Sequence, residues 1–284
     1  MVLRLSEAGI ISTSLQGMMY GFSVLMFILT GWILLRHKRR RQTNWGVMTA
    51  GFTLFSLSTA IFAVNVTRLQ EGLLDVGPFL SGGVEEYFSN ISQPTFVIKS
   101  TLYNVQTLVL DAVVIYRAYI AWQRWYAILL PVVSWLGLLA TTIGNNIALA
   151  TPGSSSSNVF ALQYGRWISA VYSTTLATNL TATGLLAYRI WMVSHRAADY
   201  VAADRLNLIL RVVIESGAIY SVAIFAALVC FLSGSAGTFV ALDLLCPLIN
   251  IVFNMIIVRV GLATDSELSP SGSVGPTSAL DFDL

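Results

Sequence analysis

Polar side chains form a continuous stripe along the apolar segment 97–120, and the stripe ends on a carboxylate. Ser100, Asn104, Thr107 and Asp111 follow one another at spacings of four, three and four residues, which places them on one face of an α-helix. The opposite face is apolar, as expected of a helix face that contacts lipid. An ionisable group in contact with hydrocarbon is costly, by about 3 kcal/mol or more. We therefore expect Asp111 to face the interior of a helix bundle or a water-filled cavity.

The same pattern recurs in the segment 238–259. Asp243, Pro247, Asn250 and Asn254 repeat the spacing of four, three and four residues. Pro247 has no backbone N–H and predicts a kink, with the freed carbonyl group satisfied by a neighbouring polar group or water. The sequence therefore predicts a second polar stripe, which begins on a carboxylate.

These stripes have two interpretations. A polar network inside a bundle can sense a ligand, bind an ion or relay protons. Amide and hydroxyl groups can instead simply join helices, through hydrogen bonds worth about 0.6–2 kcal/mol each. We favour helix joining for the amides and hydroxyls, and a functional role for Asp111 and Asp243, because a carboxylate is a costly way to join helices. The candidate intramembrane pocket comprises Asn104, Thr107, Asp111, Asn179, Thr183, Asp243, Asn250 and Asn254.

The elements that carry these side chains are predicted to be membrane-spanning helices. Of the 284 residues, 56% are hydrophobic and 11% are charged, whereas soluble domains contain about 25% charged residues. A helix needs about 20 apolar residues to cross ~30 Å of hydrocarbon. The apolar runs are continuous and do not alternate as barrel strands do. We expect an all-α, seven-transmembrane-helix bundle with spans near 12–35, 45–66, 97–120, 126–149, 166–190, 209–232 and 238–259.

The basic residues predict the orientation of this bundle. If the loop that contains Arg36 and residues 38–41 is cytoplasmic, 12 of the 16 Lys and Arg residues fall at or near that side. The N-terminus is then outside and the C-terminus in the cytoplasm. We expect a short extracellular N-terminus over 1–11, a transmembrane domain over 12–261 and a cytoplasmic tail over 262–284. Such a chain is a multi-pass protein of the plasma membrane or another endomembrane.

Two polar regions outside the spans carry signals of their own. The long outer loop 67–96 contains Asn90-Ile91-Ser92, an acceptor pattern for N-glycosylation. The tail from Thr264 is acidic and rich in Ser, Pro and Gly, which predicts disorder.

The scarcity of histidine and lysine argues against several classes of membrane enzyme and pigment. The two histidines, His37 and His195, lie in polar stretches, so zinc, di-iron and haem centres lack ligands inside the bundle. A retinal Schiff base needs a lysine in the last span, but the lysines are Lys38 and Lys99. The sequence contains no Gly-rich phosphate loop and no serine with a placed basic partner. We expect no enzymatic activity, no cofactor, no metal and no nucleic-acid partner.

Several stretches together resemble one family. The chain is similar to a large, uncharacterised family of seven-span membrane proteins from mushroom-forming (basidiomycete) fungi, over roughly residues 12–261. The resemblance implies a seven-helix bundle and a fungal origin, and it implies no ligand or activity. The stretches that carry it are YFSNISQPTFVIKSTLYNVQ (87–106), QTLVLDAVVIYRAYIAW (106–122), TNLTATGLLAYRIW (178–191), ESGAIYS (215–221) and FNMIIVRVG (253–261).

The predicted topology is also that of G-protein-coupled receptors, although the likeness is topological only. Arg117 resembles the arginine of the receptor Asp/Glu-Arg-Tyr motif, but Tyr116 precedes it in place of an acid. One interpretation pairs Arg117 with Glu215 as a cytoplasmic switch between helices. The other, which we favour, has Arg117 reach toward lipid headgroups, because it lies about 120° around the helix from Asp111. Glu215 can also pair locally with Arg211, one turn earlier.

Three functions are compatible with these features. The first is an orphan, receptor-like protein that senses a small extracellular ligand and signals to a cytoplasmic protein. The second is a small-solute or proton-coupled transporter that uses Asp111 and Asp243. The third is a membrane scaffold. In all three the lipid bilayer is a partner, and we rank the receptor-like function first.

Overall fold

The computed structural model describes residues 5–37, 45–90, 93–150, 162–196, 202–235 and 237–266. These residues form helices and short connections, and contain no strand. The long helices are α1 (Leu5–His37), α2 (Trp45–Gln70), α4 (Pro94–Trp122), α5 (Leu129–Ala150), α6 (Leu162–Arg196), α7 (Ala202–Leu232) and α8 (Gly237–Ser266). The all-helical class is therefore as predicted.

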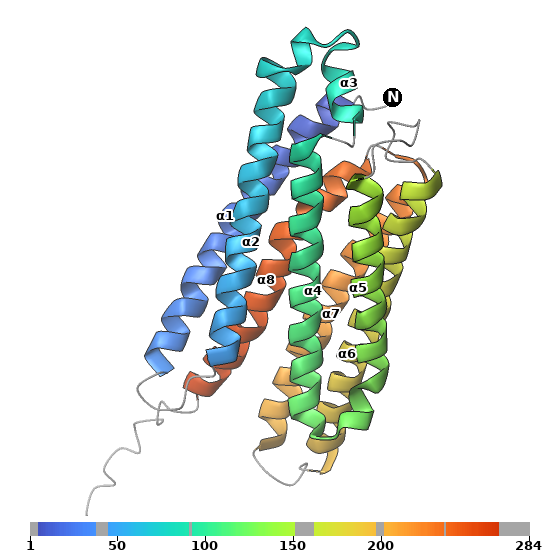
Figure 1. Cartoon of the computed structure of the whole chain (residues 1–284). Helices are drawn as coiled ribbons and strands as arrows, with labels where there is room; N and C mark the ends of the chain where they lie inside the picture. The colour runs from blue at the N-terminus through green and yellow to red at the C-terminus, as the bar shows by residue number, and fades with distance from the viewer. Residues whose placement is uncertain are drawn as a thin grey trace, which may run out of the picture.

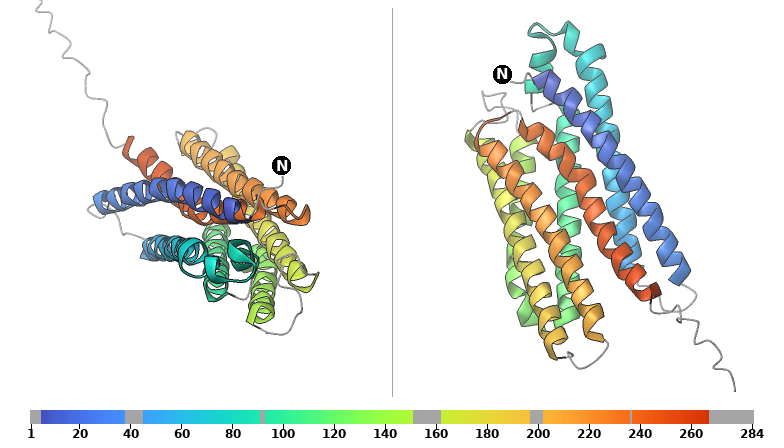
Figure 2. Two further views of the ribbon diagram at one scale, coloured as in Figure 1. Left: turned by 90° about the horizontal axis from the view of Figure 1, so that it is seen from above. Right: turned by 180° about the vertical axis from the view of Figure 1, so that it is seen from behind.

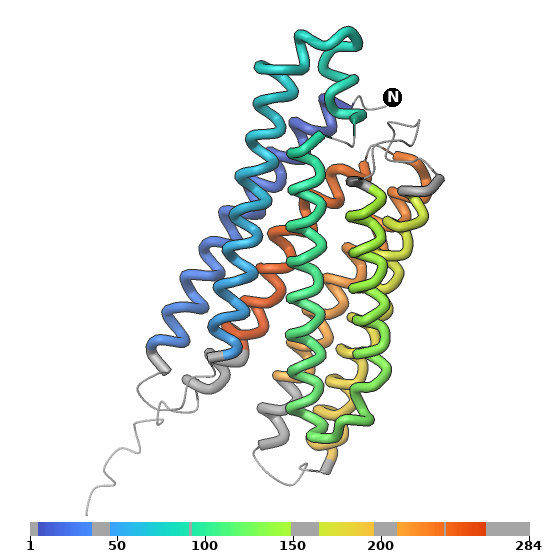
Figure 3. Tube along the Cα trace, viewed as in Figure 1, coloured from blue at the N-terminus to red at the C-terminus, as the bar shows by residue number. Residues whose placement is uncertain are grey.

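The long helices pack side by side in a ring that follows the order of the sequence (Figures 1 and 2). Each helix contacts the next one along the chain, and α8 closes the ring against α1. The helix α4 lies centrally, because it contacts α2, α5, α6 and α8. We call the end that carries α3 and the start of α1 the cap end, and the end where α4 and α6 finish the far end (Figure 3).

Six of these helices are long and apolar enough to cross a membrane: α1, α2, α4, α5, α7 and α8. They are consistent with an integral, multi-pass membrane protein. The helix α6 falls below this hydropathy because it is rich in hydroxyl side chains. The hydroxyls of Thr174, Thr178 and Thr181 donate to backbone carbonyls four residues earlier, at 2.7, 2.8 and 2.7 Å. Such internal bonds lower the cost of placing hydroxyl groups in an apolar surrounding.

The expected outer loop 67–96 is largely helical. After α2 come a π-helix (η1, Glu71–Asp75), a 3₁₀-helix (η2, Gly77–Phe79) and the short helix α3 (Gly83–Ser89). This compact turn depends on Gly77, because a Cβ atom there would lie 1.8 Å from the carbonyl oxygen of Gly72. The segment folds back over the end of the bundle, as Figure 1 shows.

The folded segment also contacts the first described residues of α1. The carboxylate of Glu85 accepts hydrogen bonds from the backbone N–H groups of Leu5 and Ser6, at 3.1 and 3.3 Å, and from the Ser6 hydroxyl. These N–H groups have no partner inside the helix, and a carboxylate also complements the helix dipole. The helix α1 is described from Leu5 and so already includes residues before the predicted span boundary at residue 12.

At the other terminus, α8 continues to Ser266, beyond the predicted boundary at residue 261. Residues 267–284 of the predicted tail lie outside the described residues, as do two residues of the Asn90-Ile91-Ser92 pattern.

The kink-prone Pro247 is held by a partner from α4. The amide of Gln106 is buried and donates a hydrogen bond of 2.8 Å to the carbonyl oxygen of Cys246. The Cys246 thiol in turn contacts the Leu242 carbonyl oxygen at 3.6 Å. The proline removes the donor to the carbonyl group four residues earlier, that of Asp243, so the Gln106 bond does not replace the missing donor; it is an additional contact that joins α4 to α8 beside the proline.

Candidate functional site

A buried ion pair joins α4 to α8 near the cap end. Lys99 is the sixth residue of α4 and Asp243 the seventh of α8, so the two lie at similar depth. The Lys99 ammonium contacts the Asp243 carboxylate, and the two side chains are 16% and 2% exposed. The cost of burying each charge is offset only while its partner remains in place.

Asn65 of α2 connects this pair to α1. Its carbonyl oxygen accepts a hydrogen bond of 2.7 Å from the Lys99 ammonium, and its amide nitrogen donates to the Asp243 carboxylate at 3.1 Å. The same nitrogen donates to the side chains of Gln16 and Thr13 at 2.6 and 3.3 Å. We call these five residues the cap cluster. It joins four helices of the ring and so fixes their relative positions at this end.

A pocket of about 680 Å³, counted to its open mouth, lies beside the ion pair and is mainly apolar. It extends to the cap end, because Phe231 at the end of α7 and Phe239 near the start of α8 line it. We call it the cap pocket. Its full lining is Phe96, Lys99, Ser100, Tyr103, Asn104, Asn145, Ile168, Val171, Tyr172, Phe231, Thr238, Phe239, Leu242, Asp243 and Cys246.

Two amide groups of the cap pocket lack partners among the described residues. They are the side-chain nitrogen of Asn104 and the side-chain oxygen of Asn145, and both residues are 3% exposed. Leaving a buried polar atom without a hydrogen bond costs about 1–3 kcal/mol. The ammonium of Lys99 has three donors, and its described partners are Asn65 and Asp243. The pocket therefore offers a molecule inside it two donors and one acceptor.

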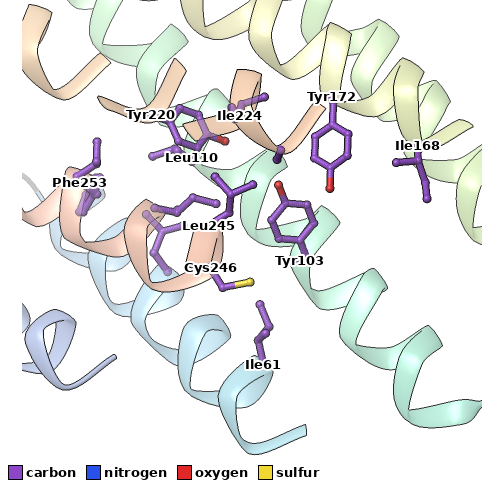
Figure 4. Packing of buried hydrophobic residues seen from close by; sticks show 14 of the residues in the cluster. Ile61, Tyr103, Leu110, Ile168, Tyr172, Tyr220, Ile224, Leu245, Cys246 and Phe253 are labelled. Carbon is purple, nitrogen blue, oxygen red and sulfur yellow. The ribbon is translucent and has the colours of Figure 1, made fainter. Parts of the chain in front are cut away.

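A packed layer separates the cap pocket from the far half of the bundle. Leu110, Tyr220, Ile224, Leu245 and Ile249 are buried and belong to one apolar cluster. Figure 4 shows the Tyr103 and Tyr172 hydroxyls pointing toward one another on one side of this layer. On its other side lies the far cavity, of about 470 Å³, bounded by α4, α6, α7 and α8.

Asp111 follows Leu110 of this layer on α4 and is a buried carboxylate. Its side chain is 1% exposed, as the helical stripe predicted, and neither carboxylate oxygen has a hydrogen-bond partner within the described parts of the chain. The Tyr220 hydroxyl is likewise buried without a described partner. Thr107, one turn away on α4, donates to the Tyr103 carbonyl oxygen at 3.0 Å.

The two amides of the second stripe have partners, one on another helix and one within α8. The Asn250 amide donates to the Ser23 hydroxyl of α1, and the Asn254 amide donates to the backbone and side-chain oxygens of Asn250 at 2.9 and 3.0 Å. Asn254 and Asn250 are fully buried. These contacts account for the amides of the second stripe as links within α8 and between α8 and α1.

Asn179 of α6 also bonds to a neighbouring helix, and it lies away from the cap pocket. Asn179 donates to the Ser221 hydroxyl at 2.8 Å and to the Gly217 carbonyl oxygen at 3.3 Å, and it accepts from Thr183 at 3.3 Å. The α6–α7 contact is tight, because a Cβ atom on Gly217 would lie 2.5 Å from the Thr183 methyl group. Asn179 and Thr183 line the far cavity, so the predicted pocket divides into separate groups.

The proposed switch pair does not form. Glu215 contacts Arg259 of α8 near the far end, and both side chains are nearly half exposed. Within the described residues, Glu215 pairs with Arg259 and not with Arg117 or Arg211. Arg117 instead lies over the ring of Phe253, 5.1 Å from its centroid, and lines the far cavity. The expectation that Arg117 reaches toward lipid headgroups stays a prediction, and its contact inside the bundle is with Phe253, a buried residue of α8.

Sequence reasoning missed Lys99, Asn65 and Gln16 as members of the site. A usable signal was present: Lys99 and Asp243 are opposite charges near the same end of two predicted spans. Charged groups at equal depth in a bundle tend to pair. Gln16 and Asn65 carried no comparable signal, because a single amide in a span is equally compatible with any neighbour.

Comparisons with protein families, with curated proteins and with solved structures found no match for this chain. The interpretation of the cap pocket therefore depends on its own geometry.

Proposed function

We propose that this chain is a receptor-like, seven-helix membrane protein that senses a small molecule in the cap pocket. In this proposal α6 is the seventh span and the cap end faces outside. The predicted cytoplasmic side then holds most of the basic residues. The plasma membrane is the proposed location, and the resemblance to seven-span fungal proteins is part of the same proposal.

The observation that carries the proposal is the pairing of an apolar pocket with unpartnered polar groups. Ligand sites are typically mainly apolar hollows of about 300–1,000 Å³ with a few convergent polar groups. The cap pocket has such a mainly apolar lining, and the side-chain nitrogen of Asn104 and the side-chain oxygen of Asn145 have no partner among the described residues. The fitting ligand is a mainly apolar molecule with one group that accepts hydrogen bonds, such as a carbonyl or hydroxyl.

The location of the ion pair supports a sensing role for the cap pocket. Lys99 and Asp243 line the pocket and also join α4 to α8. A ligand that contacts Lys99 changes the energy of a contact between two helices, which is the differential interaction that a conformational response requires. The interior is hollow at this end, which favours a ligand-binding role over a passive scaffold.

The test is a binding assay with a pocket-filled variant. Thermal unfolding of the purified full chain in lipid nanodiscs would be followed by tryptophan fluorescence, with medium-chain alcohols, ketones and carboxylates as probes. Ser100→Phe adds a ring to the cap pocket, and Val114→Phe, its matched control, adds one to the far cavity. We expect at least one probe to raise the midpoint of wild type and Val114→Phe but not of Ser100→Phe. A panel without effect, or equal shifts in both variants, would contradict the proposal.

Asp111 favours transport as a second candidate function. Its unpartnered carboxylate belongs to the region between the cap pocket and the far cavity, where a relay group of a proton-coupled transporter is expected. The two functions separate in proteoliposomes. Transport predicts pH-driven uptake of a bound probe that Asp111→Asn abolishes, whereas sensing predicts binding without uptake.

A further inference from the structure

The helix α4 carries one cation near each of its ends, and the two have different surroundings. Lys99 is the sixth residue from its start and Arg117 the sixth from its finish, so each lies about 8 Å inside the helix end. Lys99 has a carboxylate partner, Asp243. Arg117 has no ion pair and no hydrogen bond within the described residues, and its contact is with the Phe253 ring.

The far cavity does not supply the missing partner. Its polar side chains besides Arg117 are Asn179, Thr183, Ser216 and Tyr220, and the Tyr220 hydroxyl is a neutral group without a described partner. Asn179 and Thr183 bond to α7 and to each other, and the Ser216 hydroxyl donates to the Val213 carbonyl oxygen at 3.0 Å. None of these groups is an anion, so the charge of Arg117 is not balanced from inside the bundle.

A second hollow reaches Arg117 from the side of the bundle. It is a groove of about 740 Å³, counted to its open rim, between the start of α2 and the last turns of α4. We call it the α2–α4 groove. Figure 1 shows these two helices diverging toward the far end, and the view from behind in Figure 2 agrees. Its lining is Gly46, Val47, Val109, Ala112, Val113, Tyr116 and Arg117.

The walls and depth of this groove fit one end of a lipid. All lining residues except Tyr116 and Arg117 are apolar or glycine, and from Val109 to Arg117 the helix rises about 12 Å. The aromatic residues Tyr119, Trp125 and Tyr126 are exposed at the same end of the bundle. Exposed Trp and Tyr mark the level of lipid headgroups. Arg117 therefore lies within a side chain's length of that level.

We propose that the α2–α4 groove binds an anionic phospholipid, with its phosphate on the Arg117 guanidinium and its acyl chain along Val109 and Val113. A guanidinium stays charged and presents five donors that match a phosphate in a bidentate manner. The leaflet on the predicted cytoplasmic side is the anionic one. The proposal is independent of the ligand in the cap pocket. A phospholipid and a free phosphate ester would both make the Arg117–phosphate contact, so the experiment must distinguish them.

Native mass spectrometry of the purified, delipidated full chain tests this site, with phosphatidylserine and phosphatidylcholine as probes. Arg117→Gln removes the charge, and Ala112→Phe fills the groove but keeps the arginine. Arg124→Gln is the matched control, because Arg124 lies at the same end, packs on Tyr126 and does not line the groove. Arg117→Lys keeps the charge without the bidentate geometry.

We expect the wild type and Arg124→Gln to bind phosphatidylserine in preference to phosphatidylcholine. Arg117→Gln should weaken phosphatidylserine binding by about tenfold to a hundredfold, the effect of losing one charge-assisted contact. Ala112→Phe should also weaken it, and Arg117→Lys should retain part of it. Equal losses for Arg117→Gln and Arg124→Gln would indicate nonspecific attraction and overturn the site. If glycerol phosphate displaced bound phosphatidylserine as strongly as added phosphatidylserine does, the site would be one for a free phosphate and the lipid proposal would be overturned.

Discussion

Removing one partner of the Lys99–Asp243 pair should destabilise the protein more than removing both. Lys99→Met leaves the Asp243 carboxylate buried with the Asn65 amide as its remaining donor. Asp243→Asn leaves the Lys99 ammonium, which keeps its bond to the Asn65 carbonyl oxygen. The double variant contains neither charge. The three variants and the wild type thus form a double-mutant cycle around one buried contact.

The magnitudes follow from burial. Removing one member of a buried ion pair costs about 3–5 kcal/mol, because the other charge stays uncompensated. Asp243 is 2% exposed and Lys99 is 16% exposed, so a stranded lysine can shift its ammonium toward water but a stranded aspartate cannot. We expect about 4 kcal/mol for Lys99→Met and about 3 kcal/mol for Asp243→Asn. The double variant should lose only about 2 kcal/mol, since no buried charge remains.

The assay is unfolding of each protein in mixed micelles by increasing SDS, followed by circular dichroism and tryptophan fluorescence. The expected coupling energy is about 5 kcal/mol, with Lys99→Met the worse single variant. Single effects that add within about 0.5 kcal/mol would mean that the two charges do not depend on each other. That result would refute the assignment of the pair as the link between α4 and α8.

Three further substitutions test other contacts. Asp111→Asn should raise the unfolding midpoint in the same assay, because it removes a buried carboxylate with no described partner; a lower midpoint would show that the carboxylate has a stabilising partner. Gly217→Ala should cost about 1–3 kcal/mol, because the new methyl group meets Thr183 across the α6–α7 contact; an unchanged midpoint would mean that the helices separate freely there. Gln106→Leu should destabilise by about 1–3 kcal/mol by leaving the Cys246 carbonyl group without this donor, and amide hydrogen exchange should rise in the surrounding turn of α8 and not in α5.

Much of the helical framework was readable from hydropathy, because each long helix buries its own backbone hydrogen bonds and needs only a long apolar run. The helix at 162–196 shows where this signal weakens. Its threonine hydroxyls bond to the helix's own carbonyls, so composition alone understates how well it suits an apolar surrounding. The cap segment was unpredictable for a different reason. Its helix α3 contacts α1 through Glu85 and Leu5, across a separation of 80 residues.

The site was only partly readable. Helical spacing identified Asp111, Asp243 and Asn250 as inward-facing, and each is buried. Spacing cannot tell which helices become neighbours, so Asn179 was grouped with Asp243 although it bonds to α7. The ionic partner of Glu215 could not be predicted for the same reason. Glu215 pairs with Arg259, and the two meet only because α8 packs against α7.

The bond from Gln106 to the carbonyl group beside Pro247 divides α8 into arms of unequal length. The short arm holds Asp243 in the cap cluster, and the long arm runs from Pro247 to Ser266, a rise of about 28 Å. In a rigid rod pivoted at such a point, a tilt of about 5° moves the distant tip by about 2.5 Å. A shift of Asp243 by about an ångström would therefore produce a larger displacement of the far end of α8. This would not require a chain of polar contacts along the helix.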